Sequence, residues 1–225
     1  MPTTAEQETK TRLVAAASAL FAAHGFHGTK VRDIAARGGV NLASGHYHYG
    51  SKKALYLEVL REQFAEVGRV LQQLGARPTE AALRRMKPDA LLEMLHTRVQ
   101  GMLDHLLGPP PSLHGQLMMR ELMDPSEALP VVVAEFIRPM HRETEQIIEH
   151  LMPDLDAAEV ERCAYSIIGQ VLMYRFCMPA MLHMMQRDQY PAGFTHALTE
   201  HIMTFSLGGM ERMVTTQPRR KRRAR

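Results

Sequence analysis

Residues 29–53 read TKVRDIAARGGVNLASGHYHYGSKK, and this stretch decides how the N-terminal part of the chain folds. Thr29 precedes a short amphipathic run at 31–35 that the glycine pair 38–39 ends, which predicts a helix of about two turns with Thr29 as its N-cap. A third short helix is expected over residues 41–48, with its first residue as the cap. Two short helices joined at a glycine-bearing turn predict a helix-turn-helix.

The expected helix at 41–48 carries too few large apolar side chains to be buried on all sides, so one face should meet a partner. In a helix-turn-helix that face enters the major groove of DNA, while flanking groups bind phosphates. Ser44 and His46 are the candidates for contacts with base edges. Hydroxyl and ammonium groups of Thr29, Tyr47 and the segment 51–53 are the candidates for phosphate contacts. Alternatively, Tyr47 and Tyr49 serve as core aromatic residues.

Outward from this stretch the pattern stays helical, and no segment shows sustained strand alternation. Apolar spacing predicts a first helix at about 5–24 with Gly25 as its stop. The later helices are expected over a stripe of Tyr56, Leu60, Phe64, Val67 and Leu71, then at 88–107, 113–123, 127–151 with a kink or split at Pro139, 156–177 with a capping box of Asp156 and Glu159, and 193–213. The predicted fold class is all-α, with a helix-turn-helix DNA-binding domain at 1–54, a helical effector-binding and dimerisation domain at 55–213, and a basic disordered tail at 214–225.

The net charge of +3 hides an uneven distribution. Residues 1–61 hold eight Lys/Arg against four Asp/Glu, and residues 219–225 hold six Lys/Arg and no acid, so the middle of the chain is acidic. Basic ends suit a polyanionic partner. No apolar run approaches the ~18 residues of a membrane span, and no signal peptide is evident, so a cytoplasmic protein without membrane contact is expected.

The run LFAAHGFHGTKVRDIAARGGVNLASGHYHYGSKKALY, residues 20–56, resembles the N-terminal domain of TetR-family transcriptional regulators. The resemblance implies phosphate contacts from Thr29, Tyr47, His48 and Lys52, and base readout from around Asn41 to His46. At Gly45-His46 the sequence departs from the family, which commonly has an aliphatic and then an aromatic residue there. The complete set of candidate DNA-contacting residues is Thr29, Arg32, Asn41, Ser44, Gly45, His46, Tyr47, His48 and Lys52.

The segments HGQLMMRELMDPSEAL, EFIRPM and SIIGQVLMYRF, within residues 112–180, resemble the ligand-binding domain of the CerR/CecR-type subgroup. Twofold dimers are the usual way to read two DNA half-sites, and the last two long helices are the expected dimer surface. Its candidate residues are Ala164, Ile167, Ile168, Val171, Leu172, Leu198, Ile202, Phe205 and Leu207. Burial within the monomer explains any one of them equally well.

Seventeen methionines in a chain without tryptophan suggest either an adaptable apolar effector pocket or plain filling of core volume. The candidate pocket residues are Met102, Met119, Met123, Met140 and Tyr174. Three polar residues in apolar surroundings, Arg120, Glu121 and Arg138, could orient a ligand or form an internal ion-pair network. A further alternative is a soft-metal or redox sensor built from Cys177, His183, Met184 and Met185.

These patterns favour a regulator that binds a palindromic double-stranded DNA operator as a homodimer, most simply a repressor, and that a small apolar or amphipathic effector releases. No cofactor, no metal and no catalytic residue is expected, because the sequence lacks a glycine-rich phosphate loop, a nucleophile motif and an HExxH spacing. A nonspecific nucleic-acid-binding protein is the other alternative, since the basic tail could bind DNA without sequence preference.

Overall fold

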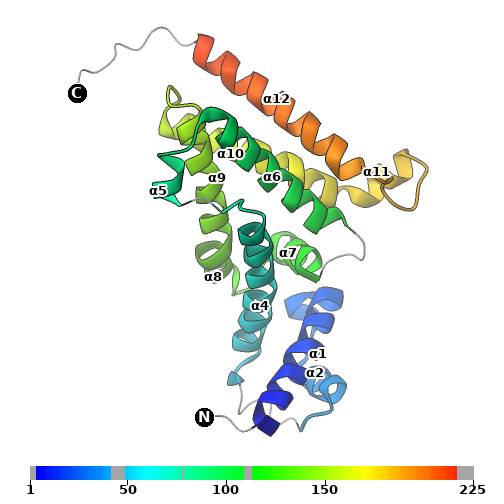
Figure 1. Cartoon of the computed structure of the whole chain (residues 1–225). Helices are drawn as coiled ribbons and strands as arrows, with labels where there is room; N and C mark the ends of the chain where they lie inside the picture. Colours follow the sequence, from blue (N-terminus) through cyan, green and yellow to red (C-terminus); the bar gives the residue numbers. More distant parts are fainter. Residues whose placement is uncertain (1–3, 42–48, 78, 109–112, 217–225) are drawn as a thin grey trace. The chain divides into compact units, whose positions relative to one another are not determined.

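The computed structural model describes residues 4–41, 49–77, 79–108 and 113–216, and every regular element in these ranges is helical (Figure 1). The chain forms two compact units, of which unit 1 comprises residues 1–69 and 108–139 and unit 2 comprises residues 70–107 and 140–225. Unit 1 therefore includes a later segment of the chain besides the N-terminal helices. The boundary expected at residue 54 stays a prediction. None of the described helices combines the length and apolarity that a membrane crossing requires.

Unit 1 is built on helix α1 (Thr4–Gly28) and helix α2 (Val31–Gly38), with α4 (Lys52–Gln73) running on into unit 2. Gly25 interrupts α1 with φ of 70° and ψ of 177°, a conformation that residues with a Cβ rarely adopt. The predicted stop at Gly25 is therefore confirmed, although one more turn follows it. The core of the unit includes Leu13, Phe21, Ile34, Tyr56 and Leu60, all almost fully buried.

The later segment of unit 1 comprises α7 (Leu113–Met123), α8 (Leu129–Val132) and a π-helical turn, η1 (Val133–Ile137). Phe136 of η1 stacks on Phe64 of α4 with ring centres 4.2 Å apart, and Glu135 forms a bidentate ion pair with Arg61. Pro139, which has no N–H to donate, follows directly in the first turn of α9 (Arg138–Leu151). The prediction that Pro139 splits the helix expected at 127–151 is confirmed. The split is the π-helical turn η1, which directly precedes α9.

Unit 2 contains α5 (Glu80–Leu83), α6 (Pro88–Leu107), α9, α10 (Ala157–Phe176), α11 (Met178–Met184) and α12 (Phe194–Thr216). Helices α6, α10 and α12 contact one another pairwise around an apolar core. The predicted capping box is present at the start of α10, where Asp156 and Glu159 each accept a hydrogen bond from the other's backbone N–H. The short helices α5 and α11 were not predicted, and α12 continues three residues past the expected end at 213.

Arg98 of α6 is almost fully buried in unit 2, with 1% of its surface exposed. Its guanidinium donates to the Thr144 hydroxyl and to the backbone oxygens of Ala76 and Met140, and it forms an ion pair with Glu143 at 3.0 Å. Burial lowers the pKa of Arg98, and the nearby Glu143 carboxylate opposes that shift. The side chain thus joins α6 to α9 and to the segment after α4, with its donors directed at acceptors of the chain.

Candidate nucleic-acid interface

The outward face of α2 is basic. Ile34 and Ala35 are buried against α1, which leaves Lys30, Arg32 and Arg37 exposed on the other side. Arg32 makes one long contact, 3.3 Å from Nε to a carboxylate oxygen of Asp33, with both side chains largely exposed. Among the described residues, neither Lys30 nor Arg37 pairs with a carboxylate. Exposed cations of this kind are available to phosphate oxygens.

The turn after α2 is formed as the glycine pair predicts. Gly39 is the C-cap, in the left-handed conformation with φ of 62°, and its N–H bonds to the carbonyls of Ala35 and Ala36. A Cβ on Gly38 would lie 3.5 Å from the backbone oxygen of Arg12, at ordinary van der Waals distance, so Gly38 lies against α1. An Arg12 nitrogen lies 4.0 Å from the position that a Cβ on Gly39 would take. Exposed Arg12 therefore adds another cation beside this turn.

Thr29 does not have the role that the sequence suggests. The N-cap of α2 is Lys30, which makes no side-chain cap bond. Thr29 is 2% exposed, and its hydroxyl lies within hydrogen-bond distance of the carbonyls of Gly25 and Leu20. The predicted cap is therefore wrong, because the carbonyls freed by the break at Gly25 are closer acceptors for the hydroxyl proton. In this conformation the same hydroxyl is not presented to a phosphate.

The start of α4 has the features expected of a phosphate-binding end. The Ser51 hydroxyl accepts a hydrogen bond from the N–H of Ala54, as an N-cap side chain does. Lys52 follows, with its Nζ 4.3 Å from the ring centre of Phe26. Burial lowers the pKa of Lys52, and the Glu127 carboxylate opposes this shift. The contact with Phe26 places the ammonium beside the positive end of a long helix, where anions bind favourably.

The predicted reading segment lies mostly outside the described residues. This is the case for Ser44, Gly45, His46, Tyr47 and His48, so their contacts with DNA stay predictions. On either side of it, Asn41 is exposed, and Tyr49 is half-buried against the core of unit 1. Burial raises the pKa of Tyr49, and the carboxylates of Glu58 and Glu62 add to that shift. Tyr49 therefore fits the interpretation as a core aromatic residue.

Two polar residues of α7 hold the N-terminal helices of unit 1. Arg120 donates to the carbonyls of Ala22 and Ala23, just before the break in α1. Glu121 is 1% exposed and accepts from the Tyr56 hydroxyl at 2.8 Å and from the backbone N–H and hydroxyl of Ser126. These two residues contact backbone and hydroxyl groups of unit 1 and form no ion pair with each other, so the ion-pair alternative is wrong for them. Arg138, the third residue of that group, is exposed.

The five candidate pocket residues do not share one core. Met102, Met140 and Tyr174 lie in or against the apolar core of unit 2, whereas Met119 and Met123 belong to unit 1. Met123 is 73% exposed, and its place in a pocket stays a prediction. Helix α7 buries its Leu117 and Met118 side, while Met123 stands at the exposed last turn.

The candidate soft ligands lie on or directly beside α11. Cys177 is half-buried, with its Sγ 3.5 Å from Sδ of Met173, while His183, Met184 and Met185 are exposed. Within the described ranges, no three residues among histidine, cysteine, aspartate and glutamate lie close enough to share a metal ion.

The candidate dimer residues divide between the inside and the outside of unit 2. Ala164, Ile167, Val171, Leu198 and Ile202 are buried in its own core, so they are not available to a partner. Phe205 is 68% exposed, and Tyr165 and Met173 are also exposed on α10. The remaining three candidates, Ile168, Leu172 and Leu207, are half-buried.

Two comparisons of sequence agree with this geometry. Residues 88–210 match the family described as the C-terminal domain of the HTH-type transcriptional dual regulator CecR, and residues 13–59 match the bacterial regulatory proteins of the tetR family. A curated relative, the HTH-type transcriptional dual regulator CecR of Shigella flexneri, is 28% identical over 180 residues, which cover 75% of this chain and 76% of the relative.

Solved structures share the fold at low sequence identity. A TetR-like transcriptional regulator from Rhodococcus sp. RHA1 superposes with a TM-score of 0.64 at 16% identity, covering 94% of this chain and 98% of that one. The transcriptional regulator FadR from Bacillus subtilis, in complex with stearoyl-CoA, gives a TM-score of 0.64 at 15% identity, with coverages of 88% and 98%. These likenesses concern the arrangement of the helices.

Proposed function

Because the chain belongs to the TetR family of transcriptional regulators and carries a CecR-type C-terminal domain, we propose that it binds a palindromic operator as a homodimer and that a small apolar or amphipathic effector releases it. A chain of this family is a DNA-binding regulator of transcription and not an enzyme. Beyond this family function, the proposal names the residues that contact DNA, the surface that forms the dimer, and the direction of regulation.

The observation that carries the proposal is the set of exposed cations around α2. Arg12 and Arg37 lie beside the turn at Gly38 and Gly39, and Lys30 lies at the other end of α2. None of these three cations pairs with a carboxylate among the described residues. Phosphate contacts fix the register of a recognition segment on the duplex, and base contacts then give the specificity. In this proposal the phosphates of the DNA backbone are bound by α2, including Arg32, and by the start of α4, including Lys52. The segment from Asn41 to His48 contacts the bases.

The outward face of α10 and α12 supports a dimer. Gly169, Gly208 and Gly209 have open space where a Cβ would stand, and exposed Tyr165 and Phe205 lie on the same two helices. Glycines on a helix surface allow a second helix to approach closely, and large exposed apolar side chains on the same helices favour burial against a partner. We assign this outward face, rather than the buried candidates, to the contact between two copies.

An effector can release the protein from DNA if it binds one conformation of the protein more tightly than the conformation that binds the operator. An effector that prefers a conformation incompatible with the operator shifts the population away from DNA by its differential binding free energy. Met102, Met140 and Tyr174 contribute adaptable apolar surface to the core of unit 2, which suits that unit to bind the effector. Repression follows if the operator overlaps the promoter.

Fluorescence anisotropy with the DNA upstream of the protein's own gene tests this proposal. We expect binding that unrelated DNA does not displace, with an endpoint of two chains per operator when the titration is done well above the Kd. Arg37→Ala should weaken binding and lower the salt slope by about one. The double substitution His46→Ala, Tyr47→Ala should abolish the preference for the operator.

The matched control is Arg85→Ala, which removes an equally exposed arginine from unit 2 and should change neither affinity nor slope. A second control ends the chain after Thr216 and so removes the basic tail. Equal affinity for operator and unrelated DNA in the wild type, or binding that depends on the tail alone, would contradict the proposal in favour of nonspecific binding.

A further inference from the structure

Arg175, in the last turn of α10, is a half-buried cation that forms no ion pair with the described residues. Its Nε–H is buried and finds no acceptor among the described residues, and its Nη1 donates to the thioether sulfur of Met178 at 3.6 Å. A thioether is a weak acceptor, whereas a guanidinium carries five N–H donors. The side chain therefore holds donor capacity that its surroundings leave unused.

No carboxylate among the described side chains pairs with Arg175. Removing a cation from water is costly unless an anion or several good acceptors replace the lost hydration. A buried donor of this kind is an expected feature of a site whose acceptor arrives with a ligand.

Aromatic and thioether side chains gather at the end of α10, which carries Arg175. The rings of Tyr190 and Phe194 stack with centres 4.3 Å apart, and Tyr174 meets Phe194 edge-on at 5.9 Å. The Tyr190 hydroxyl donates to the backbone oxygen of Tyr174 and lies 3.6 Å from Sδ of Met181. Because Tyr174 precedes Arg175 in the chain, the hydrogen bond to its backbone oxygen holds Tyr190 beside the last turn of α10. Burial raises the pKa of Tyr190, and the Arg175 cation opposes that shift.

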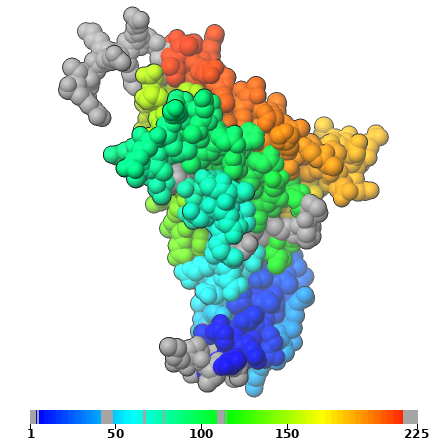
Figure 2. Space-filling model, in the orientation of Figure 1, coloured from blue at the N-terminus to red at the C-terminus, as the bar shows by residue number. Residues whose placement is uncertain are grey.

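These residues come together where α10 ends, α11 follows and α12 begins (Figure 1). Tyr174, Arg175, Met178, Tyr190 and Phe194 are all half-buried, so each still has surface that a small molecule can reach. Figure 2 shows α11 and the loop after it at the surface of unit 2. The cluster thus offers apolar contact area around one unpartnered cation, and it is open on at least one side.

We propose that Arg175 and the Tyr174–Tyr190–Phe194 aromatic cluster form a binding site for a small apolar carboxylate, whose anionic group pairs with the guanidinium while its apolar part lies on the rings and thioethers. This inference rests on the proposed function, because it names the chemical class of the effector. It also differs from the pocket expected from the sequence, of which only Tyr174 belongs to this cluster. Charge-assisted, bidentate bonds between arginine and a carboxylate supply both affinity and orientation.

The test is isothermal titration calorimetry of the full chain, without DNA, using octanoate, 1-octanol and acetate as probes. Octanoate carries both the chain and the charge, octanol has the chain alone, and acetate has the charge alone. We expect octanoate to bind roughly tenfold or more tightly than octanol, and acetate to give no measurable heat. Arg175→Met should reduce octanoate affinity to that of octanol and leave octanol binding unchanged.

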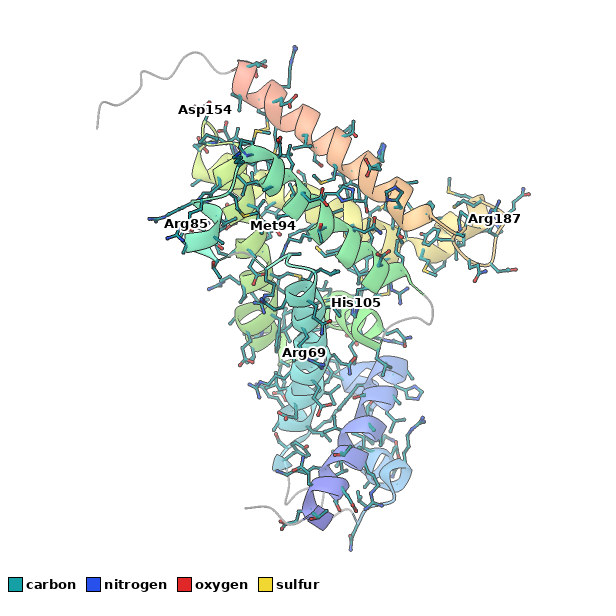
Figure 3. The ribbon with its side chains drawn as sticks, viewed as in Figure 1. Arg69, Arg85, Met94, His105, Asp154 and Arg187 are labelled. Atoms are coloured by element: carbon teal, nitrogen blue, oxygen red, sulfur yellow. The ribbon has the colours of Figure 1, made fainter. Side chains whose placement is uncertain are left out.

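The matched control is Arg187→Met, at an exposed arginine in the loop after α11 (Figure 3), which should bind octanoate like the wild type. Equal affinity for octanoate and octanol, octanoate binding that survives Arg175→Met, or no octanoate binding up to millimolar concentration would each overturn the site. Because DNA is absent, such a failure is distinct from a failure of operator binding, which the anisotropy experiment measures separately.

Discussion

Two arginines of unit 2 have opposite surroundings. The Arg98 guanidinium meets a carboxylate, a hydroxyl and two backbone oxygens of its own chain, whereas Arg175 has a thioether contact and an unpartnered Nε. Both are removed from water to some degree, and both carry the same charge. The difference indicates what each arginine does, because partnered polar groups hold a fold together and unpartnered ones are retained for something that the fold alone does not contain.

The largest expected effect comes from breaking the partnered arginine. Arg98→Met should lower the free energy of unfolding by about 3 kcal/mol or more, because it leaves buried acceptors on Thr144, Ala76 and Met140 without their donor. Urea denaturation monitored by circular dichroism measures the loss.

Arg77→Met is the matched control, because Arg77 bonds to the same Glu143 carboxylate but is itself largely exposed. Its cost should stay below about 1 kcal/mol. A comparable loss in both variants would mean that the Glu143 ion pair, and not the buried acceptors, carries the effect.

The next largest expected loss of stability concerns a buried carboxylate in unit 1, that of Glu121. Tyr56→Phe removes a donor from the buried Glu121 carboxylate and should cost about 2 kcal/mol at neutral pH. Burial raises the pKa of Tyr56, and the hydrogen bond to Glu121 raises it further, so the folded state keeps this proton when the unfolded state begins to lose it. The contribution is therefore complete below the usual tyrosine value of about 10 and is lost as the pH rises above it.

Urea denaturation at pH 7 and pH 10.5 tests the sign of this dependence. The difference in stability between wild type and Tyr56→Phe should shrink at the higher pH. Tyr165→Phe, at an exposed tyrosine, should cost less than about 0.5 kcal/mol at neutral pH. A gap that widens with pH would mean that Tyr56 is not held protonated by its surroundings.

The smallest expected effect is at the unpartnered arginine itself. Arg175→Met should change the free energy of unfolding by no more than about 0.5 kcal/mol without ligand, or raise it, since only a guanidinium–thioether contact is lost. The thermal midpoint of the variant, compared with that of the wild type, measures this. A loss above about 2 kcal/mol would place Arg175 in the same structural class as Arg98 and remove the basis of the comparison.

Much of the fold could be predicted because local sequence decides it. The bounds of α6 and α7 agree with the predicted ranges 88–107 and 113–123, since Pro88 begins one helix and a proline run separates the two. Gly39, in the left-handed conformation, ends α2 as the glycine pair predicts. Local caps and breaks depend on neighbours within a few residues, so they can be read without tertiary information.

What could not be predicted depends on contacts between distant residues. Glu121 meets Tyr56 across 65 positions of sequence, and Arg98 meets Thr144 across 46, so neither partner could be chosen from spacing. The burial of the candidate pocket residues could not be predicted either, because the methionine count does not indicate which side of a helix is covered, and Met123 is exposed. The N-cap prediction for Thr29 was wrong because its hydroxyl donates to carbonyls of preceding residues, Leu20 and Gly25, instead of capping the helix that follows.

The π-helical turn at Val133–Ile137 has a consequence for how the chain can vary in length. A turn of this kind holds one residue more than an α-helical turn, so a helix can gain or lose a residue there while the residues on both sides keep their faces. Glu135 and Phe136 occupy the wide turn, and their contacts with Arg61 and Phe64 would be the ones displaced. We therefore expect the segment between Val132 and Arg138 to tolerate the insertion or deletion of one residue.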